Sequence, residues 1–399
     1  METREVKLGN IATVKGGKRL PKGTSLITTP NNHPYIRVRD LNGRRTLELD
    51  SSFEFVDDET QKTISRYIVN AGDIVLSIVG TIGLVAIVGK SLDKANLTEN
   101  CVKLASLTGI DRDYLYYFLK SSFGQQEIAR GTVGAVQAKL PIKNIQDITI
   151  PLPDEFTQRK IAAILDSMDE KIETNQKIND NLEQQVQAYF QELFVDNADP
   201  AWTLGTISDL GTVVGGSTPS KSKPEYYTED GIAWITPKDL SINKAKFISH
   251  GENDITELGL KNSSASIMPE GTVLFSSRAP IGYIAIASGK VTTNQGFKSV
   301  VPKPEIGTAY VYCFLKHNLP VIEGMASGST FKEVSGSTMK NVPAVIPDSE
   351  TLTCFNDFCA PIFAHQRILE EQNQSLAALR DSLLPKLMSG EIDVSAIQL

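Results

Sequence analysis

Several features that would assign this chain of 399 residues to a membrane or secreted class are missing from its sequence. No run of 18 or more apolar residues exists, which excludes the usual transmembrane helix. The opening residues, Met-Glu-Thr-Arg-Glu, lack the apolar core of a signal peptide. We therefore expect a cytoplasmic protein without a membrane partner. The hydrophobic fraction of 41% and the charged fraction of 22% are typical of a soluble globular protein.

Cysteine and histidine are scarce, with four residues of each. Cys101, Cys313, Cys354 and Cys359 have no metal-ligand spacing, and no histidine cluster accompanies them. The sequence therefore predicts reduced structural thiols and no metal site. It also contains no constellation of acid, base and nucleophile, so we expect neither an enzyme nor a bound cofactor.

Two short motifs resemble catalytic or phosphate-binding sequences. Gly83 and the Gly89-Lys90-Ser91 segment resemble a P-loop, but five residues separate the glycines where four are required. A hairpin is the better interpretation of this segment. The acidic and basic triplet at 169–171 resembles part of a nuclease site, but we expect it on the outer face of a long helix.

The net charge of −7 by itself argues against binding to nucleic acid, but the distribution of the charges matters more than their sum. Residues 154–195 hold 4 basic and 9 acidic residues, and residues 348–399 hold 3 and 8. These two segments therefore carry −10, which leaves +3 for the rest of the chain (−7 + 10). The first 45 residues hold 10 basic and 3 acidic residues, so the globular parts are locally basic.

The chain repeats itself over half its length. Residues 72–87 match residues 271–286 without a gap, at an offset of 199. Gly16-Gly17 falls on Gly215-Gly216 at the same offset, while the segments near each half's end match at an offset of 194. Such a register over most of the chain indicates two copies of one module, each followed by a long helix.

Each module contains short β-type segments punctuated by glycine and proline, with one short helix. The strands are expected at 35–39, 73–78 and 83–88 in the first copy and at 234–236, 273–276 and 283–287 in the second. The helices are expected at 113–120 and 309–316.

The two long helices show a 4-3 spacing that keeps a narrow apolar seam on one face. In 161–193 the seam consists of Ile161, Leu165, Met168, Ile172, Asn175, Asn179, Leu182, Val186, Tyr189 and Leu193. In 358–387 the spacing selects Phe358, Ile362, His365, Leu369, Gln372, Leu376, Leu379 and Leu383. Two amphipathic helices on separate cores would give the same pattern, but their place after matching modules favours a mutual pair.

We expect an α+β fold, in which two repeated mixed α/β modules are joined by a long antiparallel two-helix coiled coil. The predicted boundaries are 1–153 for the first module, 154–198 for its helix, 199–347 for the second module and 348–399 for the last helix. Antiparallel pairing places Asn175 and Asn179 near Gln372 and Asn373, where polar seam residues fix the register.

Polar and basic loops lie at matching positions of the two modules, and such residues suit phosphate contacts and base-edge reading. For a single loop, a solvated turn is the commoner explanation, but both modules have these loops. The candidate DNA contacts of the first module are Lys15, Lys18, Arg19, Lys22, Arg37, Arg39, Arg44, Arg45, Gln137 and Lys139. Those of the second are Ser217, Thr218, Lys221, Lys223, Lys238, Arg278, Ser329, Thr330 and Lys332.

The motif Gln158-Arg-Lys-Ile-Ala-Ala-Ile-Leu165 and the segment 383–392 make this chain resemble a known family, the specificity subunits of type I restriction–modification systems. The resemblance covers essentially the whole chain. Residues 151–172, with Gln158-Arg-Lys-Ile-Ala-Ala-Ile-Leu165, resemble the start of the family's central helix, and residues 383–392 resemble its C-terminal motif. Residues 6–9 and 202–205 resemble the openings of its two target-recognition domains. The second helix departs from the pattern at 355–363.

The resemblance implies that each module reads one half of a split, asymmetric site in double-stranded DNA. The helices would set the spacer and dock two modification subunits, which use S-adenosylmethionine to methylate adenine, and restriction subunits would add ATP- and Mg-dependent cleavage. This chain would itself hold no cofactor. The alternative from another class is a coiled-coil scaffold whose modules bind protein or glycan.

Overall fold

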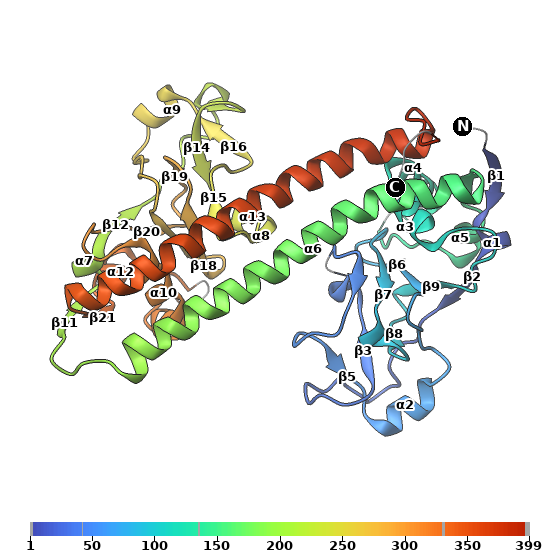
Figure 1. Cartoon of the computed structure of the whole chain (residues 1–399), viewed down its shortest axis with the longest axis horizontal. Coiled ribbons are helices and arrows are strands. Elements are labelled where there is room, and N and C mark those ends of the chain that lie inside the picture. The colour runs from blue at the N-terminus through green and yellow to red at the C-terminus, as the bar shows by residue number, and fades with distance from the viewer. Residues whose placement is uncertain (1–2, 42, 135, 329–331, 396–399) are drawn as a thin grey trace. The chain divides into compact units, whose positions relative to one another are not determined.

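The computed structural model describes residues 3–41, 43–134, 136–328 and 332–395. The chain forms two compact units, one built from Met1–Glu173 with Gln374–Leu399 and the other from Thr174–Asn373. Each unit contains one module and a segment of both long helices (Figure 1). The predicted boundaries, which separate helices from modules, stay a prediction.

The first module contains a five-stranded mixed sheet of order β2-β9-β6-β7-β4, a three-stranded sheet β5-β3-β8 and the pair β1-β10. Its strands are β1 Arg4–Lys7, β2 Thr13–Gly16, β3 Pro34–Ile36, β4 Thr46–Leu47, β5 Glu54–Phe55, β6 Ile74–Ser77, β7 Val85–Val88, β8 Asn96–Leu97, β9 Cys101–Ala105 and β10 Thr149–Leu152. Its helices are α1 Leu8–Ile11, α2 Asp58–Ile64, α3 Arg112–Lys120, α4 Ser122–Gly131 and α5 Ile142–Gln146.

The second module repeats this plan, with one strand more in the smaller sheet, as the sheets β12-β20-β17-β18-β15, β13-β16-β14-β19 and β11-β21. Its strands are β11 Thr203–Thr206, β12 Gly211–Gly215, β13 Tyr227–Thr228, β14 Ile232–Ile235, β15 Phe247–Ile248, β16 Asn253–Ile255, β17 Val273–Ser277, β18 Ile281–Ala287, β19 Thr292–Thr293, β20 Lys298–Pro302 and β21 Pro343–Ile346. Its helices are α7 Ile207–Leu210, α8 Pro237–Ile242, α9 Glu257–Lys261, α10 Thr308–His317, α11 Leu319–Gly324 and α12 Gly336–Lys340. The predicted α+β class with two repeated modules is therefore confirmed.

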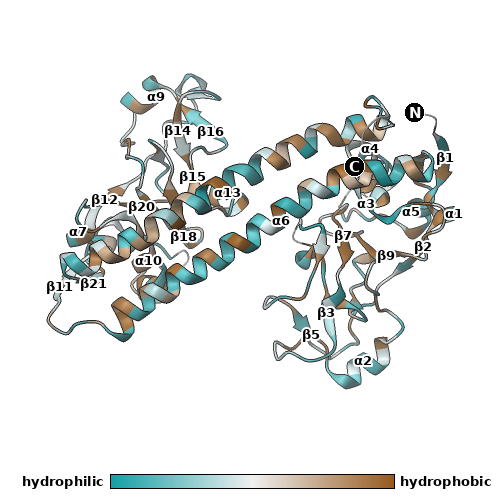
Figure 2. Cartoon of the chain, viewed as in Figure 1, coloured by the Kyte–Doolittle hydropathy of each residue, from teal (hydrophilic) through white to brown (hydrophobic). Residues whose placement is uncertain are grey.

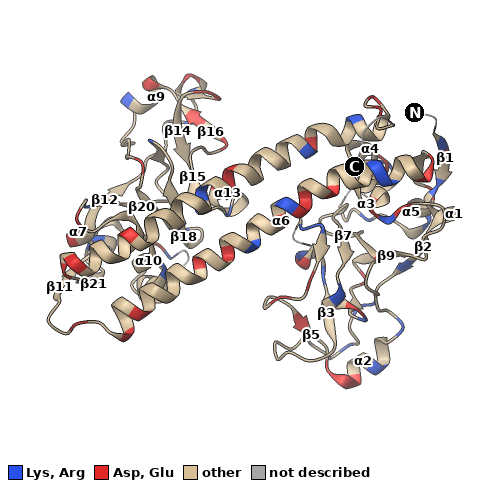
Figure 3. Cartoon of the chain, in the orientation of Figure 1, with Lys and Arg blue, Asp and Glu red and all other residues tan. Residues whose placement is uncertain are grey.

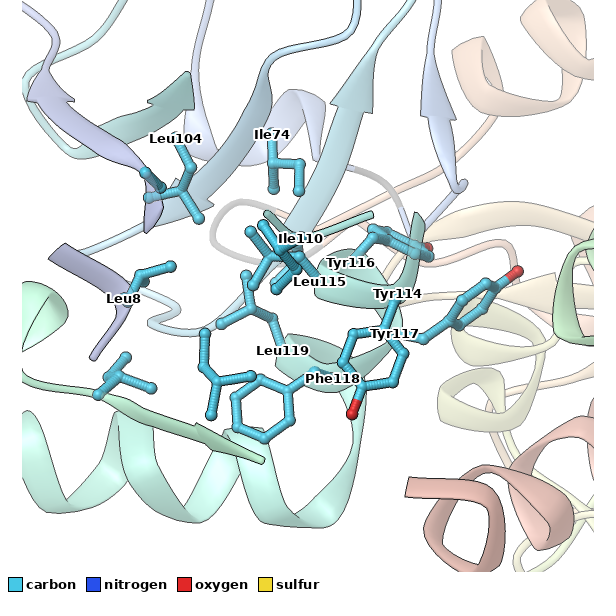
Figure 4. Packing of buried hydrophobic residues seen from close by; sticks show 14 of the residues in the cluster. Leu8, Ile74, Leu104, Ile110, Tyr114, Leu115, Tyr116, Tyr117, Phe118 and Leu119 are labelled. Atoms are coloured by element: carbon cyan, nitrogen blue, oxygen red, sulfur yellow. The ribbon is translucent and has the colours of Figure 1, made fainter. Parts of the chain in front are cut away.

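The core of each module forms where one short helix packs on the five-stranded sheet. Tyr114, Leu115 and Leu119 of α3 are fully buried among residues such as Leu8 and Ile74 (Figure 4). The Tyr114 hydroxyl donates a hydrogen bond to the Pro151 carbonyl oxygen at 2.6 Å, and Tyr310 donates to that of Val345 at 2.8 Å. These paired bonds satisfy buried hydroxyls that would otherwise each cost about 1–3 kcal/mol.

The long helices are α6, Glu155–Gln191, which continues into the π-helical turn Glu192–Asp196, and α13, Ser349–Ser389. Apolar positions recur along both between polar turns (Figure 2). In the first unit Lys160 reaches the carbonyl oxygen of Ser395 while Asp169 pairs with Arg380, so residue numbers rise on one helix as they fall on the other. In the second unit Asn175 meets Asn373 and Tyr189 meets Phe355, which gives the same antiparallel sense.

The predicted seam of α6 faces inward, but that of α13 was half wrong. Phe358, His365, Gln372 and Leu379 are exposed, whereas Ile362, Leu369, Leu376 and Leu383 are at least partly buried. The inward positions are Phe355, Cys359, Ile362, Gln366, Leu369, Asn373, Leu376, Arg380, Leu383 and Leu387, which also follow a 4-3 spacing. Polar residues in this seam hid it from a search for apolar spacing.

A second correction concerns Asp169, which was expected on the outer face of its helix. It is only 5% exposed, because it accepts a hydrogen bond from the Tyr117 hydroxyl at 2.8 Å and pairs with Arg380 of α13. Burying a carboxylate requires such partners. The charge spacing on one helix did not reveal a partner that lies more than 200 residues away.

No helix among the described residues is long and apolar enough to cross a membrane.

Candidate nucleic-acid interface

The loops that follow β2 and β12 are held against their modules by a glycine that admits no side chain. A Cβ at Gly17 would lie 2.0 Å from the Thr98 carbonyl oxygen, and one at Gly216 would lie 1.9 Å from that of Asn294. The next residues are pinned by backbone bonds, from Lys18 to Leu97 at 2.8 Å and from Ser217 to Thr293 at 2.9 Å. The repeated glycine pair therefore fixes where each polar loop begins.

An aromatic side chain anchors each of these loops at the same place. The Tyr35 hydroxyl donates to the Lys18 carbonyl oxygen at 2.7 Å, and the Trp234 indole donates to that of Ser217 at 2.9 Å. Tyr35 and Trp234 are themselves related by the offset of 199. Each loop is thus presented from a rigid base.

In the first module, the end of β2 and the loop after it display cations to solvent. Lys15, Lys18, Arg19 and Lys22 are all exposed. Arg19 pairs with Glu99 at 2.8 Å, and the Lys18 ammonium lies 5.4 Å from the centre of the Tyr67 ring. Exposed ammonium and guanidinium groups on a fixed backbone suit contacts to phosphate oxygens.

The four arginines within residues 37–45 differ in their exposure and in their ion-pair partners. Arg37 is half-buried and pairs with Asp40 and Glu54, and the more exposed Arg39 also pairs with Glu54, at 2.7 Å. Arg44 is exposed. Arg45 is only 13% exposed and pairs with two aspartates of its own unit. We therefore expect Arg37 and Arg45 to shape the module, although both were predicted to contact DNA.

The corresponding loop of the second module is richer in hydroxyl groups. Ser217 and Thr218 are half-buried, and the Thr218 hydroxyl donates to Gln295. Lys221 and Lys223 are exposed, and the Lys223 ammonium lies 5.3 Å from the Tyr226 ring centre. Lys238, also exposed, pairs with Glu252 at 2.5 Å.

A second pair of matching loops closes beside the central strands. Val133 and Lys139 exchange two backbone bonds of 2.9 Å, and Ser327 and Glu333 do the same at 3.1 and 2.9 Å. Gln137, Lys139 and Lys332 are exposed, while Ser329 and Thr330 lie outside the described residues. Val136 is 98% exposed beside Gln137. Sequence reasoning passed over this valine, because an apolar residue carries no loop or charge signal.

Two hollows bring basic residues together. One of 220 Å³ is lined by Lys15 with Arg66 and Lys103, two cations that sequence reasoning missed. Arg66 is exposed, and its position after α2 gave no motif. The other, of 630 Å³, is lined by Arg278 and Lys332, which are far apart in the sequence, and also by Glu323 and Glu333. Arg278 also pairs with Glu333 at 3.3 Å.

The polar residues of the helix seam meet within the second unit. The Asn175 amide donates to Oδ1 of Asn373 at 2.9 Å and lies 3.4 Å from Oε1 of Gln372. Asn179 instead faces Gln366, whose amide donates to the Asn179 carbonyl oxygen at 3.1 Å. That these contacts fix the register of the helices stays a prediction.

Charge is distributed unevenly over the elements (Figure 3). Acidic residues recur along α6 and α13, and basic residues occur near the loops of the first module. Within the part of the chain that the structure describes, no group of three or more His, Cys, Asp and Glu residues could hold a metal ion.

Comparison with known proteins gives a consistent result. The profile of the "Type I restriction modification DNA specificity domain" matches residues 1–184 and 201–371. The MjaIX specificity subunit of Methanocaldococcus jannaschii is 40% identical over 191 residues, which span 46% of this chain and 44% of the relative. The HindI specificity subunit of Haemophilus influenzae is 24% identical over 330 residues, 64% of this chain and 71% of the relative.

A solved structure agrees with the fold. The crystal structure of the type I restriction-modification S subunit from M. genitalium superposes with a TM-score of 0.58 at 18% identity, covering 97% of this chain and 96% of that one.

Proposed function

Because the chain belongs to the type I restriction–modification DNA specificity family, we propose that it reads a split, asymmetric target in double-stranded DNA. Each module would read one half-site. The observation that carries this proposal is that one scaffold occurs twice with different loop residues. The shared scaffold would present both sets of loops to DNA in the same way, and the different side chains on these loops would select different bases.

The loops supply both kinds of contact that such reading needs. Lys15, Lys18 and Lys22 would contact phosphates, which fix the position of the module on the duplex. The amide of Gln137 and the guanidinium of Arg278 are each able to form two hydrogen bonds with the edge of one base. Val136 adds an exposed apolar group, which suits the methyl group of thymine in the major groove.

The long helices would set the spacer between the two half-sites. The 37 residues of α6 correspond to roughly 55 Å at 1.5 Å per residue. Half-sites centred about one turn of DNA apart, on one face of the duplex, are compatible with such a spacer. Acidic outer faces repel DNA and favour a protein partner, so we expect the helices to dock two modification subunits.

The chain itself would be the recognition component of a cytoplasmic complex. Modification subunits would bring S-adenosylmethionine and methylate adenine, and restriction subunits would bring ATP- and Mg-dependent cleavage. We expect this chain to bind none of these cofactors.

Methylome sequencing of the host tests the proposal directly. We expect a split methyladenine motif that disappears when this chain is deleted and returns when it is restored. Insertion of four residues, about one helical turn, into both long helices should change the spacer of the motif and leave both half-site sequences unchanged.

Binding as a function of salt separates this proposal from a scaffold that binds protein or glycan. A DNA reader loses affinity steeply as salt rises, because phosphate contacts release counterions. Absence of any sequence preference at every salt concentration, with the modification subunit present, would contradict the proposal.

A further inference from the structure

A cation with little solvent exposure, Arg45 or Lys246, stands at the same place in both modules, one residue before the edge strand of the five-stranded sheet. Ile87 donates its backbone N–H to the Arg45 carbonyl oxygen at 2.8 Å, and Ile286 donates to that of Lys246 at 2.7 Å. Ile87 and Ile286 are matched residues of the repeat. Arg45 and Lys246 are therefore structural equivalents, although the offset of 199 would align Arg45 with Lys244.

In the first unit this cation joins the module to a long helix. The Arg45 guanidinium donates to Asp113 of α3 at 2.5 Å, and its Nε lies 2.8 Å from Oδ1 of Asp166 on α6. It also stands 6.0 Å from the centre of the Tyr116 ring. The hydrogen bond to Asp113 and the ion pair with Asp166 thus tie α3 and α6 to one guanidinium group.

In the second unit Lys246 reaches both long helices and is only 6% exposed. Its ammonium pairs with Glu183 of α6 and donates to Oε1 of Gln366 on α13 at 2.5 Å. The ring centre of Phe363 lies 4.0 Å away, and that of Tyr312, the repeat equivalent of Tyr116, lies 4.8 Å away.

The backbone around Lys246 strengthens this attachment. The N–H groups of Lys246 and Phe247 donate to the two carboxylate oxygens of Glu370 on α13, at 2.8 and 3.0 Å. Gln366, which receives the ammonium, also contacts Asn179 in the helix seam. One contiguous set of contacts thus leads from the edge strand of the module through the helices.

We infer that Arg45 and Lys246 are positioning residues that fix the orientation of each recognition module on the helix pair and so restrict the spacer length that the protein accepts. This inference rests on the proposed function. Neither cation is available to a ligand, because Lys246 is buried, Arg45 is only 13% exposed, and both pair with carboxylates of their own unit. They act on DNA through the direction in which the module presents its loops.

The test uses the full chain with its modification subunit and the duplex found by methylome sequencing. Companion duplexes keep both half-sites but have spacers one base pair shorter or longer. We expect Lys246→Met to reduce the preference for the native spacer by about tenfold, which corresponds to about 1.4 kcal/mol. Single-base changes within each half-site should keep their wild-type effects.

Lys244→Met is the matched control, since it removes the same charge from an exposed lysine two residues away and should leave the spacer preference unchanged. Arg45→Met should loosen the spacer preference as Lys246→Met does, and Arg45→Lys should restore it in part. If Lys246→Met does not fold, Glu370→Gln replaces it, because it weakens the acceptor of the two backbone bonds.

The outcomes are distinguishable. A wild-type complex without sequence preference overturns the proposed function. A wild-type complex that reads both half-sites, with folded Lys246→Met or Glu370→Gln showing the wild-type spacer preference, overturns only the inference about positioning. A variant that also changes base preference inside a half-site contradicts it as well.

Discussion

The two modules agree in their interiors and differ on their surfaces. The order of the five-stranded sheet, the buried tyrosines on α3 and α10, and the close glycine contacts recur in both copies. The first loop of one module, by contrast, carries Lys18 and Arg19 where its counterpart carries Ser217 and Thr218, although Lys22 is matched by Lys221. Packing requires volumes and hydrogen bonds that suit one scaffold, while exposed loops are free to change. The variable part of the molecule is therefore the part able to read different sequences.

The shared interior predicts the largest effect. Leu119 of α3 and Leu315 of α10 occupy equivalent, fully buried positions. Each change to Ala should lower the free energy of unfolding of its own unit by about 2–5 kcal/mol, because a cavity replaces packed methyl groups. Hydrogen exchange resolves the two units, and both tryptophans, Trp202 and Trp234, report on the second unit alone. Equal loss of protection in both units from one substitution would show that the modules are not independent.

The junctions between module and helices differ in their response to pH. Burial would raise the pKa of Glu183, but the ammonium groups of Lys246 and Lys316 lower it to about 2. Glu183 thus stabilises the folded state above about pH 4.5, and this contribution, about 3 kcal/mol, is lost as the pH falls towards 2. In the first unit, burial raises the pKa of Asp166 to about 6, against the effect of Arg45. The contribution of Asp166 to the stability of the folded state is therefore greatest below the pKa that this residue has in the unfolded chain, and it is lost as the pH rises through 6.

Unfolding by denaturant at a series of pH values checks this contrast. Glu183→Gln should reduce the loss of second-unit stability at acid pH, which tryptophan fluorescence measures. Asp166→Asn should reduce the change in first-unit stability near pH 6, which hydrogen exchange of the first-unit amides measures. The prediction fails if both variants alter the same limb of the pH profile.

The surface difference predicts the smallest effects, and these are confined to one half-site. Neutralising Lys18 or Lys22 should reduce the salt slope of binding by about one for each phosphate that the variant no longer neutralises. Ser217→Ala should leave that slope unchanged while altering base preference in the other half-site. Titrations at several salt concentrations, with one half-site mutated at a time, measure both. If a single loop substitution changes the reading of both half-sites, the assignment of one half-site to each module is wrong.

Much of this fold was predictable from the sequence, because the information was local or repeated. The internal match between 72–87 and 271–286 gave two modules, and the 4-3 spacing of α6 gave a helix with one buried face. The loops around Gly17 and Gly216 could also be found, since a repeated glycine pair indicates a close approach of the backbone.

The seam of α13 could not be found in this way. Its inward face includes Gln366, Asn373 and Arg380, and each of these polar side chains contacts α6, while Gln366 also accepts a hydrogen bond from Lys246 of the module. The competing face carries Phe358 and Leu379, which look like seam residues but are exposed. A pattern based on hydrophobicity chooses the wrong face whenever the correct one is stabilised by specific polar partners.

The sequence by itself determined the repeat, the α+β class, the family and the basic character of the loops, because these depend on residue order within short windows. Only the tertiary structure decided which charges are exposed and which are buried. Lys18 and Arg45 each count as one positive charge in the sequence, yet Lys18 faces solvent and Arg45 joins a module to its helix. The physical reason is that a buried charge needs partners, and the partners of Arg45 and Lys246 lie on distant helices that only folding brings together.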